Sequence, residues 1–136
     1  MKFAACLPLL CVASCLLVGC GERTASPSAP PGEVAARWWR AVASGDGEAV
    51  AGSVASDSGR AESAKMVAEY ARVRKAAGEG DRLAGRMLTR LEGVRIGESR
   101  GSTMLAVVPL TFADGKPFLK VYLESRGGRW LIVDLK

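Results

Sequence analysis

Apolar residues recur every three to four positions through much of residues 33–80, which is the spacing of amphipathic helices. Glycine-containing segments divide this region into three predicted helices. The apolar positions that define them are Val34, Trp38, Ala41 and Val42 in the first helix, Val50 and Val54 in the second, and Met66, Val67, Tyr70, Val73 and Ala77 in the third. Asp46 is placed to cap the second helix, and residues 56–59 are predicted to break the chain before the third. Gly78 and Gly80 then stop the third helix.

Residues 81–91 fit two different structures. Their apolar positions suit a helix capped by Asp81, but part of the same set alternates as it would in a strand. The residues concerned are Leu83, Met87, Leu88 and Leu91 for the helix, and Met87, Thr89 and Leu91 for the strand. We favour the helix, because it places Arg82, Arg86 and Arg90 on one side at four-residue steps. These arginines form either a basic patch toward anionic membrane lipid or a cell-wall polymer, or a merely solvated helix face.

The last third of the chain alternates between apolar and polar residues, as half-buried strands do. Strands are predicted over residues 94–98, 103–112, 117–125 and 129–135. Asp114-Gly115 and Gly127-Gly128 are typical of two-residue hairpin turns, and such turns fix the pairing of the strands. The predicted pairs are Leu110 with Leu119, Val108 with Val121, Leu123 with Ile132, and Val121 with Asp134. One face of this sheet is then apolar except for Asp134, whereas the opposite face, which includes Phe118, is mixed.

Helices followed by an antiparallel meander with one apolar face predict an α+β fold. In such a fold the N-terminal helices pack on one face of a curved antiparallel sheet. The folded domain is expected to span residues 33–136. Residues 20–32 are rich in serine and proline and hold no core-forming side chains, so they read as a flexible tether with a reach of about 20 Å.

The first twenty residues have the pattern of a targeting segment. Lys2 precedes an apolar run that is too short and too interrupted to span a membrane comfortably. The run ends in Leu17-Val18-Gly19-Cys20, which resembles the signal of bacterial lipoproteins. The resemblance implies a signal peptide over residues 1–19, acylation of Cys20 and anchorage in the cell envelope. Gly21 stands where the inner-membrane retention signal has Asp, which favours the periplasmic face of the outer membrane in a Gram-negative bacterium.

Composition narrows the chemistry that the 136-residue chain can perform. It contains no histidine, which excludes a histidine base, a histidine-containing triad and histidine metal ligands. The cysteines other than Cys20 lie in the predicted signal peptide, so no thiol nucleophile is expected. Neither a phosphate-binding Gly-Lys loop nor calcium-loop spacing occurs, and we therefore expect no cofactor and no metal. The formal net charge is +5; in an exported protein this favours anionic lipid or cell-wall polymer over nucleic acid as a partner.

Two short motifs resemble a known family. Val34-Ala-Ala-Arg-Trp-Trp-Arg-Ala-Val-Ala-Ser-Gly-Asp46 resembles the opening helix and turn of the nuclear-transport-factor-like, or cystatin-like, cone domains. Arg126-Gly-Gly-Arg-Trp130-Leu-Ile resembles their last hairpin. Small lipoproteins of unknown function that are related to proteins described as lumazine-binding combine this domain with a lipoprotein signal. The resemblance implies a curved sheet around a long helix, often with a cone-shaped pocket, but no particular activity.

Four residues are candidates for lining such a pocket: Trp38, Trp39, Tyr70 and Asp134. The two tryptophans point about 100° apart on a helix, so one is expected in the core and the other could floor a ligand cavity. Tyr70 could donate a hydrogen bond to a ligand or lie in the core, and Asp134 would either have a raised pKa inside the cone or be solvated at its rim. The favoured interpretation is a non-enzymatic lipoprotein that binds a small apolar ligand or an envelope partner. The alternatives are an interaction module with a filled cone, and an isomerase- or hydratase-type enzyme that uses Asp134 and Tyr70.

Overall fold

The structure, a computed structural model, describes residues 28–136. The predicted signal peptide and the predicted acylation site Cys20 lie outside the described residues. Four helices precede an antiparallel sheet of five strands, so the α+β class is confirmed. The elements are α1 (Pro31–Ser44), α2 (Gly47–Ser53), α3 (Asp57–Gly78), α4 (Arg82–Glu92), β1 (Arg95–Ile96), β2 (Arg100–Gly101), β3 (Leu105–Thr111), β4 (Pro117–Arg126) and β5 (Arg129–Leu135).

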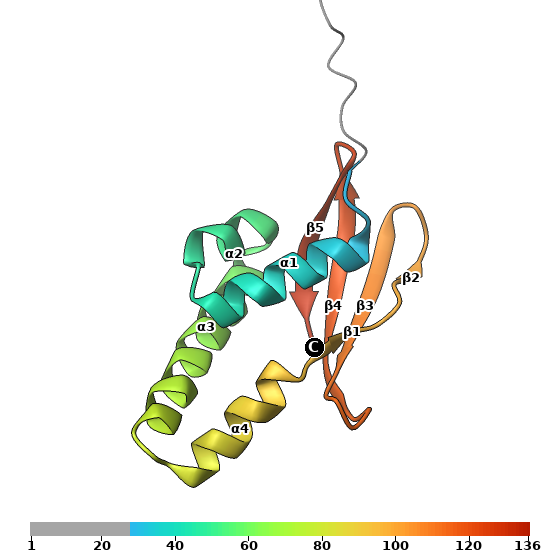
Figure 1. Ribbon diagram of the computed structural model, residues 1–136. Helices are drawn as coiled ribbons and strands as arrows, with labels where there is room; N and C mark the ends of the chain where they lie inside the picture. The colour runs from blue at the N-terminus through green and yellow to red at the C-terminus, as the bar shows by residue number, and fades with distance from the viewer. Residues whose placement is uncertain (1–27) are drawn as a thin grey trace, which may run out of the picture.

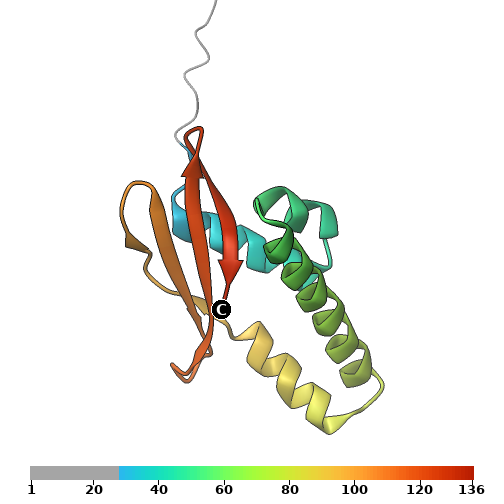
Figure 2. The same cartoon turned by 180° about the vertical axis from the view of Figure 1, so that it is seen from behind.

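One helix crosses the sheet, and the α3–α4 hairpin lies beside it. Helix α1 lies in front of the sheet in Figure 1 and behind it in the view from the opposite side in Figure 2. Helices α3 and α4 diverge from α1 and the sheet, and they meet at a turn at the end of the molecule opposite to the first described residues. The strands follow the order β1-β3-β4-β5, and β2 pairs with the same edge of β3 as β1 does.

The helix ends follow from local capping. The Asp46 side chain accepts a hydrogen bond from the Ala49 amide at 3.0 Å, as predicted for the start of α2. The predicted break between the second and third helices exists, but it lies at residues 54–56 and not at 56–59, because α3 already begins at Asp57. Ser56 is the cap of α3, and its hydroxyl accepts the Gly59 amide at 3.0 Å. A serine placed directly before a helix satisfies a free amide, so the helix starts immediately after Ser56 and includes residues 57–59.

Residues 81–91 are helical, which confirms the favoured alternative. The Asp81 carboxylate accepts hydrogen bonds from the amides of Leu83 and Ala84 at 2.8 and 3.1 Å, and this cap fixes the start of α4. At the other end of α4 the chain passes almost directly into β1. The predicted strand over 94–98 is therefore reduced to two residues, and the short strand β2 was not predicted.

The first hairpin differs from its prediction near the turn. The central pairs Leu110–Leu119 and Val108–Val121 are confirmed, but Thr111 lies opposite Pro117, so that β4 holds one extra residue, Phe118. The predicted two-residue turn at Asp114-Gly115 is wrong. The Phe112 amide donates to the Lys116 carbonyl at 2.9 Å around a three-residue loop, in which Gly115 has a φ of 82°. A left-handed glycine at this position is typical of three-residue hairpin loops with a bulge.

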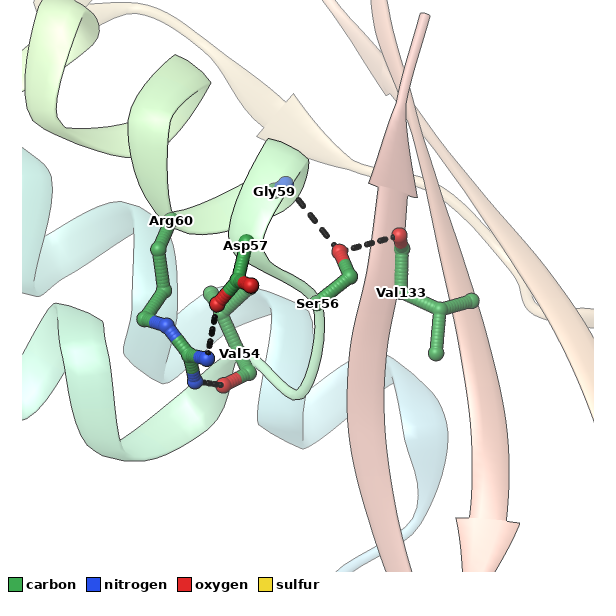
Figure 3. Close-up of polar contacts among 6 residues, drawn as sticks. All are labelled: Val54, Ser56, Asp57, Gly59, Arg60 and Val133. Atoms are coloured by element: carbon green, nitrogen blue, oxygen red, sulfur yellow. Dashed lines mark hydrogen bonds and ion pairs between the residues drawn. The ribbon is translucent and has the colours of Figure 1, made fainter.

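The second hairpin also contains a bulge. The Gly127-Gly128 turn and the Leu123–Ile132 pair are confirmed, but Val133 is an extra residue in β5. Asp134 therefore lies opposite Tyr122, and its predicted place opposite Val121 on the apolar face is wrong. Two carbonyl groups at this bulge accept hydrogen bonds from the segment before α3. The Ala55 amide donates to Ile132 at 2.8 Å, and the Ser56 hydroxyl donates to Val133 at 2.6 Å (Figure 3).

The main core lies between α1 and the sheet. Its largest fully buried apolar side chains come from α1 and from strands β3, β4 and β5: Trp38, Val42, Val108, Leu110, Val121, Leu123 and Ile132. The indole nitrogen of Trp38 donates a hydrogen bond of 3.1 Å to Ser63 of α3, whose side chain is also fully buried. This bond links the two longest helices inside the core and satisfies both polar groups.

Candidate functional site

An apolar pocket opens between α1, α3, α4 and β4. Its volume is about 250 Å³. It is lined by Trp39, Met66, Glu69, Tyr70, Val73, Met87, Leu91 and Phe118. Glu69 is the only charged residue of this lining. The pocket exists because α3 and α4 diverge from the sheet, so that their facing apolar side chains do not close completely over Trp39.

Three aromatic rings form the floor of the pocket. Trp39 meets the edge of Tyr70, with 5.8 Å between ring centroids, and that of Phe118 at 5.2 Å. Edge contacts of this kind are favoured by the ring quadrupoles and hold the indole in one orientation. Phe118 reaches Trp39 only because the bulge in β4 turns it toward the helices, whereas the predicted regular pairing placed it on the other face of the sheet. The bulged hairpin around Gly115 thus places Phe118 in the floor of the pocket.

The mouth of the pocket is formed by α4. Met87 lines the pocket and is still 43% exposed, and Leu83, one turn earlier on the same helix, is 67% exposed. A methionine at a pocket mouth adapts to ligands of different shape, because its side chain is unbranched and polarisable. The apolar stripe of α4 therefore continues from the pocket out to the surface.

Tyr70 supplies a polar group at the pocket. The residue is only 4% exposed, and its hydroxyl forms no hydrogen bond with any other residue of the described range 28–136. No fully buried polar side-chain atom in this range lacks a partner, so the hydroxyl must be open to the pocket or to solvent. Arg74 lies over the ring, with its guanidinium carbon 5.0 Å from the centroid. The hydroxyl is thus free to bond to a ligand, while the ring is held in place.

Glu69 is a charged group of the rim rather than a proton-transfer group. Its carboxylate accepts a hydrogen bond from Arg72 Nε at 2.9 Å, and its side chain is 58% exposed. This hydrogen bond lowers the pKa of Glu69 below its ordinary value, so the group stays ionised. A carboxylate held as a paired anion is a poor general acid at neutral pH.

The structure brings together two of the four predicted pocket residues. Trp39 and Tyr70 touch in the pocket, whereas Trp38 is fully buried in the main core and is not part of it. Asp134 lies on the other face of the sheet, beside Tyr122, and forms an ion pair of 3.1 Å with Lys136. The hydrogen bond from Lys136 lowers the pKa of Asp134, which is opposite to the shift expected inside a cone. The structure does not place Asp134 and Tyr70 in one site.

The sequence prediction missed Met66, Met87, Leu91 and Phe118 as pocket residues. A signal for Met87 and Leu91 was present, since both lie on the apolar stripe of residues 81–91 once these are taken as a helix. Phe118 had no comparable signal, because its orientation depends on a bulge that alternation alone does not indicate.

The arginines of α4 separate into two environments. Arg82 and Arg86 lie beside Gly85 and Thr89 along an open depression of the surface. Arg90 instead lies over the ring of Phe112 at 4.2 Å and within 4.0 Å of the Asp114 carboxylate. The predicted row of three is therefore a pair of solvent-facing arginines and one that secures the β3–β4 loop.

Residues 28–136 contain no group of three or more side chains placed to bind a metal ion. No helix in this part of the chain combines the length and the apolar composition needed to cross a membrane.

Comparison of the chain with protein-family models, curated proteins and solved structures gave no match. The geometry of the pocket is thus the main guide to function.

Proposed function

We propose that the protein is a bacterial lipoprotein, anchored through Cys20, whose α+β domain binds a small apolar ligand between α3 and α4. The lipoprotein signal at residues 17–20 supports the anchor, and the apolar pocket over Trp39 supports the binding role. Its place in the cell is proposed to be the periplasmic face of the outer membrane. We also propose that the domain belongs to the nuclear-transport-factor-like cone family, which the motifs at residues 34–46 and 126–132 support.

The observation that carries the binding role is the chemical contrast inside the pocket. Apart from Glu69 at the rim, the lining consists of apolar side chains together with the hydroxyl of Tyr70, which has no hydrogen-bond partner among residues 28–136. Ligand pockets combine apolar walls with a few polar groups that orient the ligand. A cavity of 150 Å³ holds benzene, so about 250 Å³ corresponds to a compact molecule of roughly ten non-hydrogen atoms. The expected ligand is uncharged and has one group that hydrogen-bonds to Tyr70.

The test is native mass spectrometry of the acylated chain purified from its membrane. A bound ligand appears as an additional mass that is lost on denaturation. Met87→Trp should remove this mass by closing the mouth, because Met87 lines the pocket where it opens to the surface and tryptophan is the larger side chain. Leu83→Trp is the matched control: it lies on the same stripe of α4 but outside the lining, and should retain the ligand. Equal retention by both variants would contradict the proposed location.

Tyr70→Phe tests the polar contact separately. Removal of one neutral hydrogen bond weakens binding by about 0.5–1.5 kcal/mol, which corresponds to roughly a 2- to 12-fold loss of affinity. An unchanged affinity would mean that the hydroxyl does not touch the ligand. A wild-type chain without any additional mass, and without thermal stabilisation by small molecules extracted from the same envelope, would favour the alternative of an interaction module with a filled domain.

A further inference from the structure

The end of the domain that the tether joins, here called the tether end, carries exposed apolar and basic side chains. The start of α1, the β2–β3 connection and the β4–β5 turn all lie at this end, and the α3–α4 turn lies at the other (Figures 1 and 2). Four large apolar residues of the described range are well exposed. Two of them lie on α4: Met87 at the pocket mouth and Leu83 one turn before it. The other two, Met104 and Leu105, are each 59% exposed at the tether end.

Met104 and Leu105 are displayed by a well-bonded connection. The Ser102 hydroxyl accepts hydrogen bonds from the amides of both residues at 3.2 Å, and the Met104 carbonyl accepts the Ser125 amide of β4 at 2.9 Å. Gly101 has a φ of 140° and lies so close to the Leu105 backbone that a side chain would not fit. The two apolar side chains are therefore held outward on a fixed support, not on a loose loop.

The arginines at the tether end outnumber the glutamates with which they pair. Glu33 and Glu124 each bind an arginine, Arg37 at 3.2 Å and Arg126 at 3.1 Å. Arg100 and Arg129 are exposed at the same end, and neither forms an ion pair with another residue of the described range. Arg126 and Arg129 flank the β4–β5 turn, and Arg100 precedes the Ser102 connection.

The point where the tether joins the domain determines which end of the domain stays close to the anchoring membrane. Residues 28–30 lie along a groove that also contains Arg129 and Trp130, so the chain leaves the domain at the basic end. Eight residue steps separate Cys20 from Ser28, and they span at most about 29 Å when fully extended. If Cys20 is acylated, this end of the domain is never farther than that from the bilayer surface.

We propose that the tether end docks directly on an anionic phospholipid bilayer, with Met104 and Leu105 inserted into the interface and Arg100 and Arg129 on the phosphates. The inference rests on the lipid anchor of the proposed function but not on the pocket. Apolar side chains flanked by arginines bind such interfaces by burial of apolar area and by attraction to anionic headgroups. Docking turns the α3–α4 pocket away from the membrane, toward the aqueous compartment.

The experiment uses two acylated variants of the full chain, each with one fluorescent label: one at the tether end of the domain and one on α4. Acylation converts the Cys20 sulfur into a thioether, and cleavage after Gly19 removes Cys6, Cys11 and Cys15. A cysteine introduced by Leu105→Cys is then the only thiol of the acylated protein that reacts with an environment-sensitive dye. Leu83→Cys is the matched control, since Leu83 is equally apolar and more exposed but lies on α4. Both proteins are reconstituted in vesicles of phosphatidylcholine, with or without phosphatidylglycerol, and acylation is verified by the mass of the N-terminal peptide.

The label at position 105 should shift to shorter wavelengths and be quenched by brominated lipid when phosphatidylglycerol is present, and the label at 83 should not. Arg100→Gln and Arg129→Gln should each lower the ratio of docked to undocked protein about fivefold, whereas Arg82→Gln should leave it unchanged. An acylated protein whose label at 105 stays in water in both kinds of vesicle would overturn the proposal, as would equal quenching at both positions. Met104→Cys repeats the test if Leu105→Cys does not fold.

Discussion

Replacement of Gly59 by alanine should destabilise the domain, although alanine is the better helix former. Gly59 is the third residue of α3 and approaches the chain that enters this helix. A Cβ added there would lie 2.7 Å from Ser56 Oγ and 2.7 Å from Val54 Cγ1. Ser56 cannot move away without cost, because its hydroxyl also donates to the Val133 carbonyl at 2.6 Å (Figure 3).

The magnitude follows from opposing contributions. Alanine in place of glycine inside a helix stabilises by about 1 kcal/mol. Displacement of Ser56 weakens a helix cap, worth about 1 kcal/mol, and leaves the Val133 carbonyl without its partner, at a cost of about 1–3 kcal/mol. The crowded Val54 side chain adds to this cost. The balance is a destabilisation of about 2 kcal/mol, or a fall in Tm of roughly 10 °C for a domain of this size.

The assay is urea and thermal unfolding followed by circular dichroism, with Gly85→Ala as the matched control. Gly85 lies inside α4, and no atom lies within 4 Å of a Cβ added there. Gly85→Ala should therefore show the helix contribution alone, a gain of about 1 kcal/mol. The two substitutions change the same atoms and should act with opposite sign. If Gly59→Ala stabilised the protein as Gly85→Ala does, the close packing of α3 against Ser56 would be refuted.

Three further outcomes are expected. Ser63→Ala should destabilise the protein by about 1–3 kcal/mol, because it leaves the Trp38 indole N–H unpaired in the core; chemical denaturation measures this, and a neutral result would contradict the bond. Asp134→Asn should lower Tm at neutral pH, because the Lys136 hydrogen bond depresses the pKa of Asp134 in the folded protein. The stability that this carboxylate contributes is present above the unfolded pKa of about 3.9 and is lost as the pH falls through the folded pKa. The Tm values of the variant and the wild type, measured against pH, should therefore converge in acid. Cys20→Ser should abolish radioactive palmitate labelling and leave an unprocessed precursor, whereas persistent labelling would exclude the anchor.

Elements whose signal is local were predictable from the sequence. The cap at Asp46, the helix after Asp81 and the Gly127-Gly128 turn depend on neighbouring residues only, and all three are confirmed. The central strand pairs were also correct, since alternation and turn spacing act together there. Within the pocket, Trp39 and Tyr70 were identified because helical periodicity sets their direction.

The two bulges account for the errors about which residues face the helices. In β5 the extra residue Val133 allows two carbonyls to meet Ala55 and Ser56, which lie nearly eighty positions earlier in the chain. Alternation cannot reveal such a partner, so Asp134 was assigned to the wrong face. In β4 the bulge reverses Phe118 in the same manner. A shift of one residue exchanges the faces of every residue beyond it, which is why a correct turn did not guarantee a correct site.

If the proposed lipid anchor holds many copies on one membrane, the contacts of Ala55 and Ser56 have a consequence for their behaviour. Strand β5 is the last in the sheet order, and such a terminal strand offers free backbone groups to any neighbouring sheet. Here the Ala55 amide occupies the Ile132 carbonyl and the Ser56 hydroxyl occupies that of Val133. Proteins anchored to one surface meet in two dimensions at high local concentration. By occupying two carbonyls of this edge from within its own chain, the domain leaves fewer free backbone groups for edge-to-edge pairing where crowding would promote it.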